Sequence, residues 1–183
     1  MSKSAPLVTA EELEKYPDDD YRYELVEGRV IKMSPVGFQH GRIVPRFASL
    51  LHRHVEEHGL GAILSEVGFR LASNPDTVRA PDIAFLRLDR IPKPDPRGFI
   101  NGPPDLAVEV LSPDDPPGEV RTKTAKYLAC GVPLVLILDP VGRTATAHRQ
   151  VGPPQISRGD DAVDLGDAVP GFSCSIPEIF GQS

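Results

Sequence analysis

The chain has no tryptophan, and its aromatic side chains are four tyrosines and seven phenylalanines. This aromatic content gives no sign of a stacking platform for single-stranded nucleic acid. The two cysteines, Cys130 and Cys174, are far apart, and neither belongs to a Cys-x-x-Cys pair. We therefore expect reduced thiols in a cytoplasmic protein rather than a disulfide framework or a thiolate metal site.

Several familiar sequence signatures are missing as well. The chain has no G-x-x-x-x-G-K-[ST] phosphate loop, no dinucleotide glycine fingerprint, no G-x-S-x-G and no H-E-x-x-H. These absences argue against the common nucleotide-binding, serine-hydrolase and zinc-protease sites. No apolar run reaches the length needed to span a membrane, so we expect no membrane partner.

The composition that remains is typical of a globular domain. Of 183 residues, 40% are hydrophobic and 25% are charged, which predicts a single domain over 1–183 with residues 1–6 disordered. The net charge of -6 argues mildly against non-specific coating of nucleic acid. A local basic cluster lies on one predicted helix, although a solvated helix face is the simpler interpretation. The cluster consists of Arg42, Arg46, His52, Arg53 and His54.

Apolar periodicity and turn residues predict alternating strands and helices. We expect helices over 9–15, 38–58, 118–129 and 177–180, and strands over 22–26, 29–33, 62–65, 68–72, 83–87, 106–111, 134–138 and 144–149. Pro45 should kink the second of these helices or shift its start. Strand 106–111, helix 118–129 and strand 134–138 form a βαβ unit, whose two strands should be parallel. The fold class is therefore α/β with α+β-like features, a mixed β-sheet flanked by helices.

Two acidic residues stand inside or beside apolar strands. Asp82 directly precedes the run 83–86, and Glu109 lies within the run 106–111. A carboxylate buried in such a strand is costly unless something pairs with it, and two on neighbouring strands repel each other. A divalent cation between them would remove both costs, and oxygen ligands favour Mg²⁺, Mn²⁺ or Ca²⁺.

The order of motifs around these carboxylates resembles a family of bacterial restriction-endonuclease-like proteins, abundant in cyanobacteria and the Deinococcus–Thermus lineage. That family belongs to the PD-(D/E)XK phosphodiesterase superfamily, and the resemblance extends from about Tyr21 to Phe180. The matching residues are Glu24-Leu25-Val26-Glu27-Gly28, His40, Pro81-Asp82, Pro104-Asp105-Leu106-Ala107-Val108-Glu109-Val110-Leu111-Ser112, Lys123, Tyr127, Gly131-Val132-Pro133, Asp139-Pro140 and Pro170-Gly171-Phe172.

The resemblance implies a restriction-endonuclease-like fold and a metal-dependent phosphodiesterase that hydrolyses DNA with Mg²⁺ or Mn²⁺. It implies that Asp82, Glu109 and the backbone carbonyl of Val110 hold the metal, and that Lys123 positions the attacking water. It also implies that Glu24 and His40 assist catalysis. A homodimer or higher homo-oligomer is expected, because cutting both strands usually needs two sites.

The simple E-x-K pattern is broken, because Leu111 stands where a lysine would follow Glu109. Asp82 could instead be a turn residue, Glu109 could form a buried pair with a cation, and Lys123 could pair on the helix surface with Glu119. Lys126 is interpreted as a solvated lysine, and Glu66 is a weaker acidic candidate. The alternative function is a catalytically inactive nuclease-fold protein that acts as a binding or dimerisation module.

Overall fold

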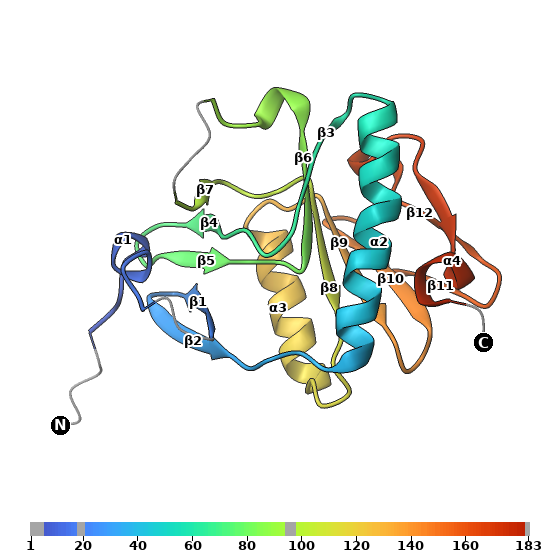
Figure 1. Ribbon diagram of the computed structural model, residues 1–183. Helices are drawn as coiled ribbons and strands as arrows, with labels where there is room; N and C mark the ends of the chain where they lie inside the picture. The colour runs from blue at the N-terminus through green and yellow to red at the C-terminus, as the bar shows by residue number, and fades with distance from the viewer. Residues whose placement is uncertain (1–5, 18–20, 94–97, 182–183) are drawn as a thin grey trace.

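The protein is described by a computed structural model covering residues 6–17, 21–93 and 98–181. Its centre is a six-stranded mixed sheet with the strand order β11-β10-β9-β8-β6-β3 (Figure 1). The strands are β3 (Gly61–Leu64), β6 (Ile83–Arg87), β8 (Leu106–Val110), β9 (Leu134–Asp139), β10 (Thr144–Arg149) and β11 (Gln155–Arg158). The strands β6, β8 and β9 are almost wholly buried. Their continuous apolar runs are typical of strands that are covered on both faces of a sheet.

A second, five-stranded sheet lies beside the first, with the order β2-β1-β5-β4-β7. Its strands are β1 (Arg22–Val26), β2 (Arg29–Met33), β4 (Phe69–Ala72), β5 (Thr77–Arg79) and β7 (Ile100–Asn101). The β1–β2 hairpin turns through Glu27 and Gly28, both at positive φ (50° and 74°). This is the backbone conformation that matches the twist of two-residue hairpins. A separate pair, β12 (Ala162–Asp164) and β13 (Ser173–Ser175), lies near the C-terminal end of the chain.

The described residues contain four α-helices and two short 3₁₀ segments. They are α1 (Ala10–Leu13), α2 (Phe38–Glu57), α3 (Pro117–Ala129), α4 (Ile176–Phe180), η1 (Leu88–Arg90) and η2 (Gly166–Ala168). Thr9 caps α1 and forms a reciprocal capping box with Glu12. Pro45 lies inside α2 without shifting its start from Phe38. Within the described residues, no helix combines the length and apolar character needed to cross a membrane.

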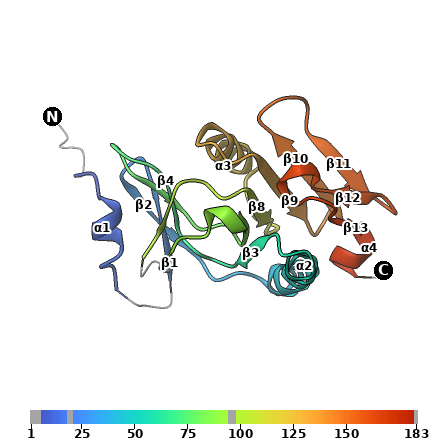
Figure 2. The same cartoon turned by 90° about the horizontal axis from the view of Figure 1, so that it is seen from above.

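Helices cover both faces of the six-stranded sheet (Figure 2). On one face, α2 buries the apolar stripe Ile43, Phe47, Leu51 and Val55 against the sheet, as the 3.6-residue periodicity predicts. On the other face, α3 and the second sheet share a core in which Tyr127 packs with residues of both sheets. The second sheet therefore meets the first at the face that carries α3.

The predicted fold class is confirmed, and so is the βαβ unit. Strands β8 and β9 are parallel, with Leu106 opposite Leu134, and α3 connects them. The second sheet as a separate unit was not predicted, because β5 and β7 are only three and two residues long. Strand β11 was also missed. Of the predicted disordered start, residues 1–5 lie outside the described residues.

Candidate active site

Asp82 and Glu109 lie at the same end of two neighbouring antiparallel strands, β6 and β8. Asp82 directly precedes β6, and Glu109 is in β8, one step beyond the pair formed by Ile83 and Val108. Glu109 shares the face of Ala107, which carries α3, whereas Asp82 lies just outside the ladder and contacts His40 of α2. Both acidic residues are buried, with exposed fractions of 6% and 9%.

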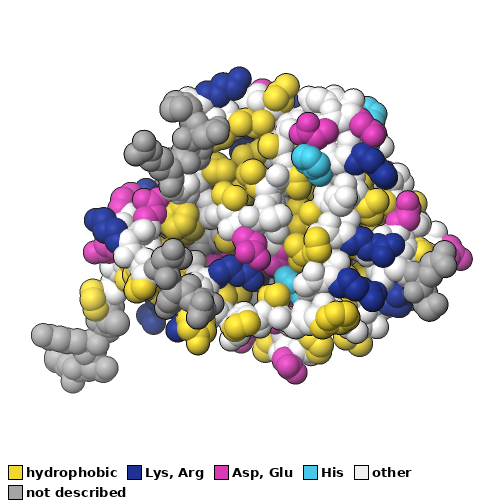
Figure 3. Space-filling model, viewed as in Figure 1, with side chains coloured by type: hydrophobic (Ala, Val, Ile, Leu, Met, Phe, Trp, Pro, Cys, Tyr) yellow, Lys and Arg dark blue, Asp and Glu magenta, His cyan; other side chains and the backbone are white. Residues whose placement is uncertain are grey.

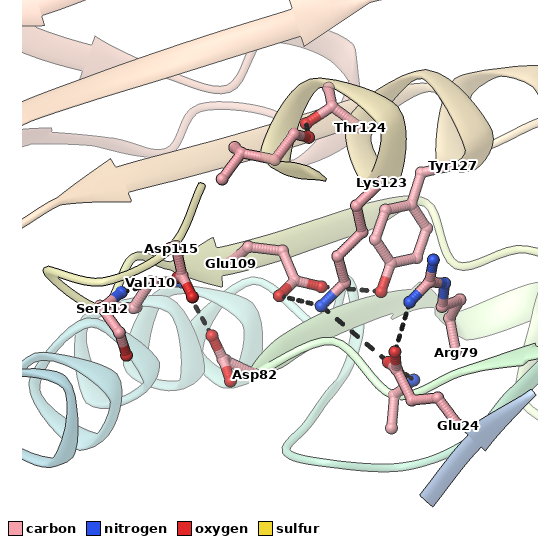
Figure 4. A network of polar contacts seen from close by, with 12 residues as sticks. Glu24, Arg79, Asp82, Glu109, Val110, Ser112, Asp115, Lys123, Thr124 and Tyr127 are labelled. Carbon is pink, nitrogen blue, oxygen red and sulfur yellow. Dashed lines mark hydrogen bonds and ion pairs between the residues drawn. The ribbon is translucent and has the colours of Figure 1, made fainter. Parts of the chain in front are cut away.

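Helix α3 brings two donors to Glu109 (Figure 4). Lys123 and Tyr127 are four residues apart and therefore share one helix face. The Lys123 Nζ atom donates to Oε2 of Glu109 at 2.6 Å, and the Tyr127 hydroxyl donates to Oε1 at 2.8 Å. Tyr127 is fully buried, so its ring fixes the direction of that hydroxyl. Both oxygens of Glu109 are thus held by one helix.

The second sheet contributes Glu24 and a cation that the sequence did not reveal, Arg79. The Arg79 guanidinium donates to Oε2 of Glu24 at 2.5 Å, and the amide of Ala80 donates to Oε1 at 3.0 Å. Lys123 Nζ lies 4.0 Å from Oε1 of the same carboxylate. Arg79 ends β5, a strand of three residues that is too short to predict from the sequence. Its position three residues before Asp82 was the only sequence feature that could have pointed to a role in the site.

Asp82 is held from two directions. The amide of Val110 donates to its Oδ2 atom at 2.8 Å, and Nε2 of His40 lies 3.1 Å from the same oxygen. His40 is in the first turn of α2 and is 7% exposed, and its Nδ1 atom is buried without a partner among the described residues. The structure thus places His40 and Val110 beside Asp82. Val110 contacts Asp82 through its backbone N–H, whereas the group expected at the metal is its carbonyl.

Burial and crowding of like charges dominate the electrostatics of the site. Burial raises the pKa of Glu109 from 4.5 to about 7, Lys123 partly offsets it, and the carboxylates of Asp82 and Glu24 add to it. Burial alone would lower the pKa of Lys123, but Glu109 and Glu24 outweigh that effect and raise it. Burial and the neighbouring Glu109 raise the pKa of Tyr127 as well. Lys123 and Tyr127 therefore keep their protons at neutral pH and act as hydrogen-bond donors to Glu109.

The donor set fits a hard divalent cation. Of three buried carboxylates, Glu24 and Glu109 pair with the cations Arg79 and Lys123, and Asp82 pairs with neither. Among the residues that the structure describes, no three acidic, histidine or cysteine side chains are already arranged as a metal site. This agrees with the engagement of Glu24 by Arg79 and Ala80. Asp82 and Glu109 are the two carboxylates that could hold Mg²⁺ or Mn²⁺.

Other residues singled out in the sequence lie elsewhere. Glu66 pairs with Arg22 at 2.7 Å, and Lys126 donates to Glu27 at 2.7 Å, so Lys126 is not the freely solvated lysine that was expected. Glu119 is exposed, and Lys123 pairs with the site carboxylates instead.

The basic cluster on α2 was interpreted as a solvated helix face, and the structure corrects this in part. Arg42 donates to the carbonyl of Phe180 at 3.0 Å, and Arg46 donates to that of Glu178 at 2.6 Å. Lys and Arg side chains gather over α2 and α4 on the right of Figure 3. At least two of these arginines therefore attach α4 to α2.

The fold is that of a nuclease-like α/β protein. It superimposes on a crystal structure from Anabaena variabilis ATCC 29413, described as "a putative nuclease belonging to DUF820", with a TM-score of 0.84 and 22% sequence identity. The match covers 94% of this chain and 97% of the other. The chain itself belongs to the Uma2 family, described as "Putative restriction endonuclease", whose model matches residues 10–177. The resemblance noted in the sequence is thereby confirmed. No curated protein matches the chain.

Proposed function

We propose that this protein is a divalent-metal-dependent phosphodiesterase that hydrolyses DNA. The observation that carries the proposal is the contact of 2.6 Å between the half-buried Lys123 and the buried Glu109, with Asp82 directly before the adjacent strand β6. An ammonium beside two nearby carboxylates combines groups that can hold a cation with a hydrogen-bond donor for the reacting groups. Membership of the Uma2 family supports the nuclease class.

In this proposal, Asp82 and Glu109 hold Mg²⁺ or Mn²⁺, with the carbonyl of Val110 as a further ligand. The bound cation would offset the charge that develops on the phosphoryl oxygens and promote ionisation of the attacking water. Because the pKa of Lys123 is raised, its ammonium stays protonated, so it positions water and phosphate by donating hydrogen bonds and does not act as a base.

Glu24 and His40 assist in different ways. Glu24 holds Arg79 and the amide of Ala80, which stabilises the segment leading to Asp82. His40 is too buried to meet a substrate, and its Nε2 atom orients the carboxylate of Asp82. Both are positioning residues in this mechanism.

Metal binding is the first test. Calorimetric titration with Mg²⁺ and Mn²⁺ should give binding to the wild type that is lost in Asp82→Ala. The matched control is Asp105→Asn, because Asp105 is an equally buried, ion-paired carboxylate at the opposite end of β8, beside Arg90. The control should bind metal as the wild type does. Failure of the wild type to bind either cation would refute the proposal.

Cleavage is the second test. Supercoiled, linear duplex and single-stranded DNA should be cut in the presence of Mg²⁺ or Mn²⁺, and Glu109→Gln should abolish cutting. Gln keeps the size of the side chain and one carbonyl oxygen but removes the charge that holds the cation. A wild type that binds metal and cuts none of these DNAs would count against DNA as the substrate.

One observation favours the alternative, a nuclease fold kept as a binding or dimerisation module. Each site carboxylate already accepts a donor within the protein, as a purely structural network would. The alternative predicts no metal binding and an unchanged melting temperature on addition of Mg²⁺. Sedimentation would establish whether the chain forms the expected homodimer or a higher homo-oligomer.

A further inference from the structure

The two donors that hold Glu109 differ in what a bound cation would do to them. Lys123 is a charged, flexible side chain, 22% exposed, and a second acceptor, Oε1 of Glu24, lies 4.0 Å from its Nζ atom. A cation near Glu109 would repel this ammonium, and Lys123 can move toward Glu24 without becoming unpaired. The hydrogen bond to Oε2 is therefore exchangeable.

Tyr127 behaves differently, because it is neutral and cannot move. Its ring is 1% exposed and packs in the core shared by the two sheets, and its hydroxyl lies 2.8 Å from Oε1. Withdrawal of the hydroxyl would leave a buried donor without an acceptor, which is energetically costly. The hydrogen bond to Oε1 therefore persists while Oε2 becomes available.

We propose that Tyr127 is a positioning residue that sets the metal preference of the site by retaining Oε1 of Glu109 and leaving Oε2 to bind the cation. This inference rests on the proposed function. A carboxylate limited to one oxygen suits Mg²⁺, which demands a near-ideal octahedron of six ligands, and is compatible with Mn²⁺. It suits Ca²⁺ less well, because Ca²⁺ readily takes both oxygens of a carboxylate.

The test is calorimetric titration of MgCl₂, MnCl₂ and CaCl₂ into the wild type and Tyr127→Phe. Loss of a group that orients a metal ligand typically changes metal affinity by about 10- to 100-fold. In Tyr127→Phe we expect weaker Mg²⁺ and Mn²⁺ binding and a ratio of Ca²⁺ to Mg²⁺ dissociation constants that falls about tenfold. A residue that only stabilised the fold would lower the melting temperature and leave this ratio unchanged.

Thr124→Val is the matched control, since Thr124 is a buried hydroxyl on the same helix that donates to the carbonyl of Val120. It should keep the wild-type ratio. Lys123→Met provides an independent variant, should Tyr127→Phe fold poorly. It frees Oε2 but keeps Tyr127 on Oε1, so all three affinities should hold or rise together, with no change in ratio.

The outcomes separate the two proposals. A wild type that binds no divalent cation overturns the proposed function together with this inference. A wild type that binds Mg²⁺ while Tyr127→Phe keeps the same Ca²⁺ to Mg²⁺ ratio overturns only the role of Tyr127. A ratio that changes in Lys123→Met also overturns it, because the preference would then depend on Lys123.

Discussion

Replacement of Glu109 by Gln should change how the stability of the metal-free protein depends on pH. In the unfolded chain this carboxyl loses its proton near pH 4.5, whereas burial raises the pKa in the folded protein to about 7. Between these values the folded protein binds a proton that the unfolded chain lacks. The contribution to stability is therefore fully present below pH 4.5 and is lost as the pH rises through 7.

The size of the effect follows from the same two values. At about 1.4 kcal/mol per pH unit, a carboxyl whose pKa rises from 4.5 to about 7 loses up to about 3 kcal/mol of folding free energy between pH 5 and 8. Gln does not titrate, so this loss should be absent in Glu109→Gln. Relative to the wild type, the variant should gain about 3 kcal/mol over that range. The five histidines are common to both proteins and cancel in the difference.

Urea unfolding in EDTA, followed by circular dichroism at several pH values from 5 to 8, measures this difference. Glu178→Gln is the control, because the backbone N–H of Ser175 lowers the pKa of Glu178 and its titration falls below the range. In Glu178→Gln the unfolding free energy should change with pH as it does in the wild type. Identical slopes for the wild type and Glu109→Gln would refute the reasoning, since they would mean that Lys123 fully compensates the burial of a charged Glu109.

Three further predictions concern the supports around the site and the two thiols. Arg79→Met should lower the unfolding free energy by about 3–5 kcal/mol, because Glu24 would remain buried without its cation; a loss below 1 kcal/mol in urea unfolding would contradict this. Thr9→Ala should cost about 1 kcal/mol by removing the cap of α1, and an unchanged thermal midpoint would show that the capping box does not stabilise the fold. Burial raises the pKa of Cys174 to about 12, so in the native protein a thiol reagent should label the half-buried Cys130 first, as peptide mass spectrometry would report.

The central sheet and its two long helices could be predicted because each has a strong local signal. Strand β9 is a continuous apolar run, and α2 repeats buried side chains at helical spacing. The parallel pairing of β8 with β9 followed from the helix between them. Each of these elements buries its own apolar stripe, so its sequence pattern and its environment agree.

Strands β1, β2 and β4 were predicted, but the second sheet as a separate unit could not be, because β5 and β7 depend on partners that are distant in sequence. Strand β5 joins β1 to β4, and β7 adds only Ile100 and Asn101 beside β4. No hydrophobic period is visible over two or three residues. Arg79 was missed for this reason, although it makes the shortest contact of the site.

The placement of the lysine shows why the site depends on tertiary structure. In the plain motif, a lysine two residues after the glutamate shares its strand and its face of the sheet. Here Leu111 occupies that position and packs into the core beneath α3, while Lys123 reaches Glu109 from the helix. Residues four apart lie on the same face of a helix, so Tyr127, one turn after Lys123, contacts the other oxygen of Glu109. Leu111 in place of a strand lysine therefore coincides with a second donor on Glu109, and the packing of α3 on the sheet determines the orientation of this carboxylate.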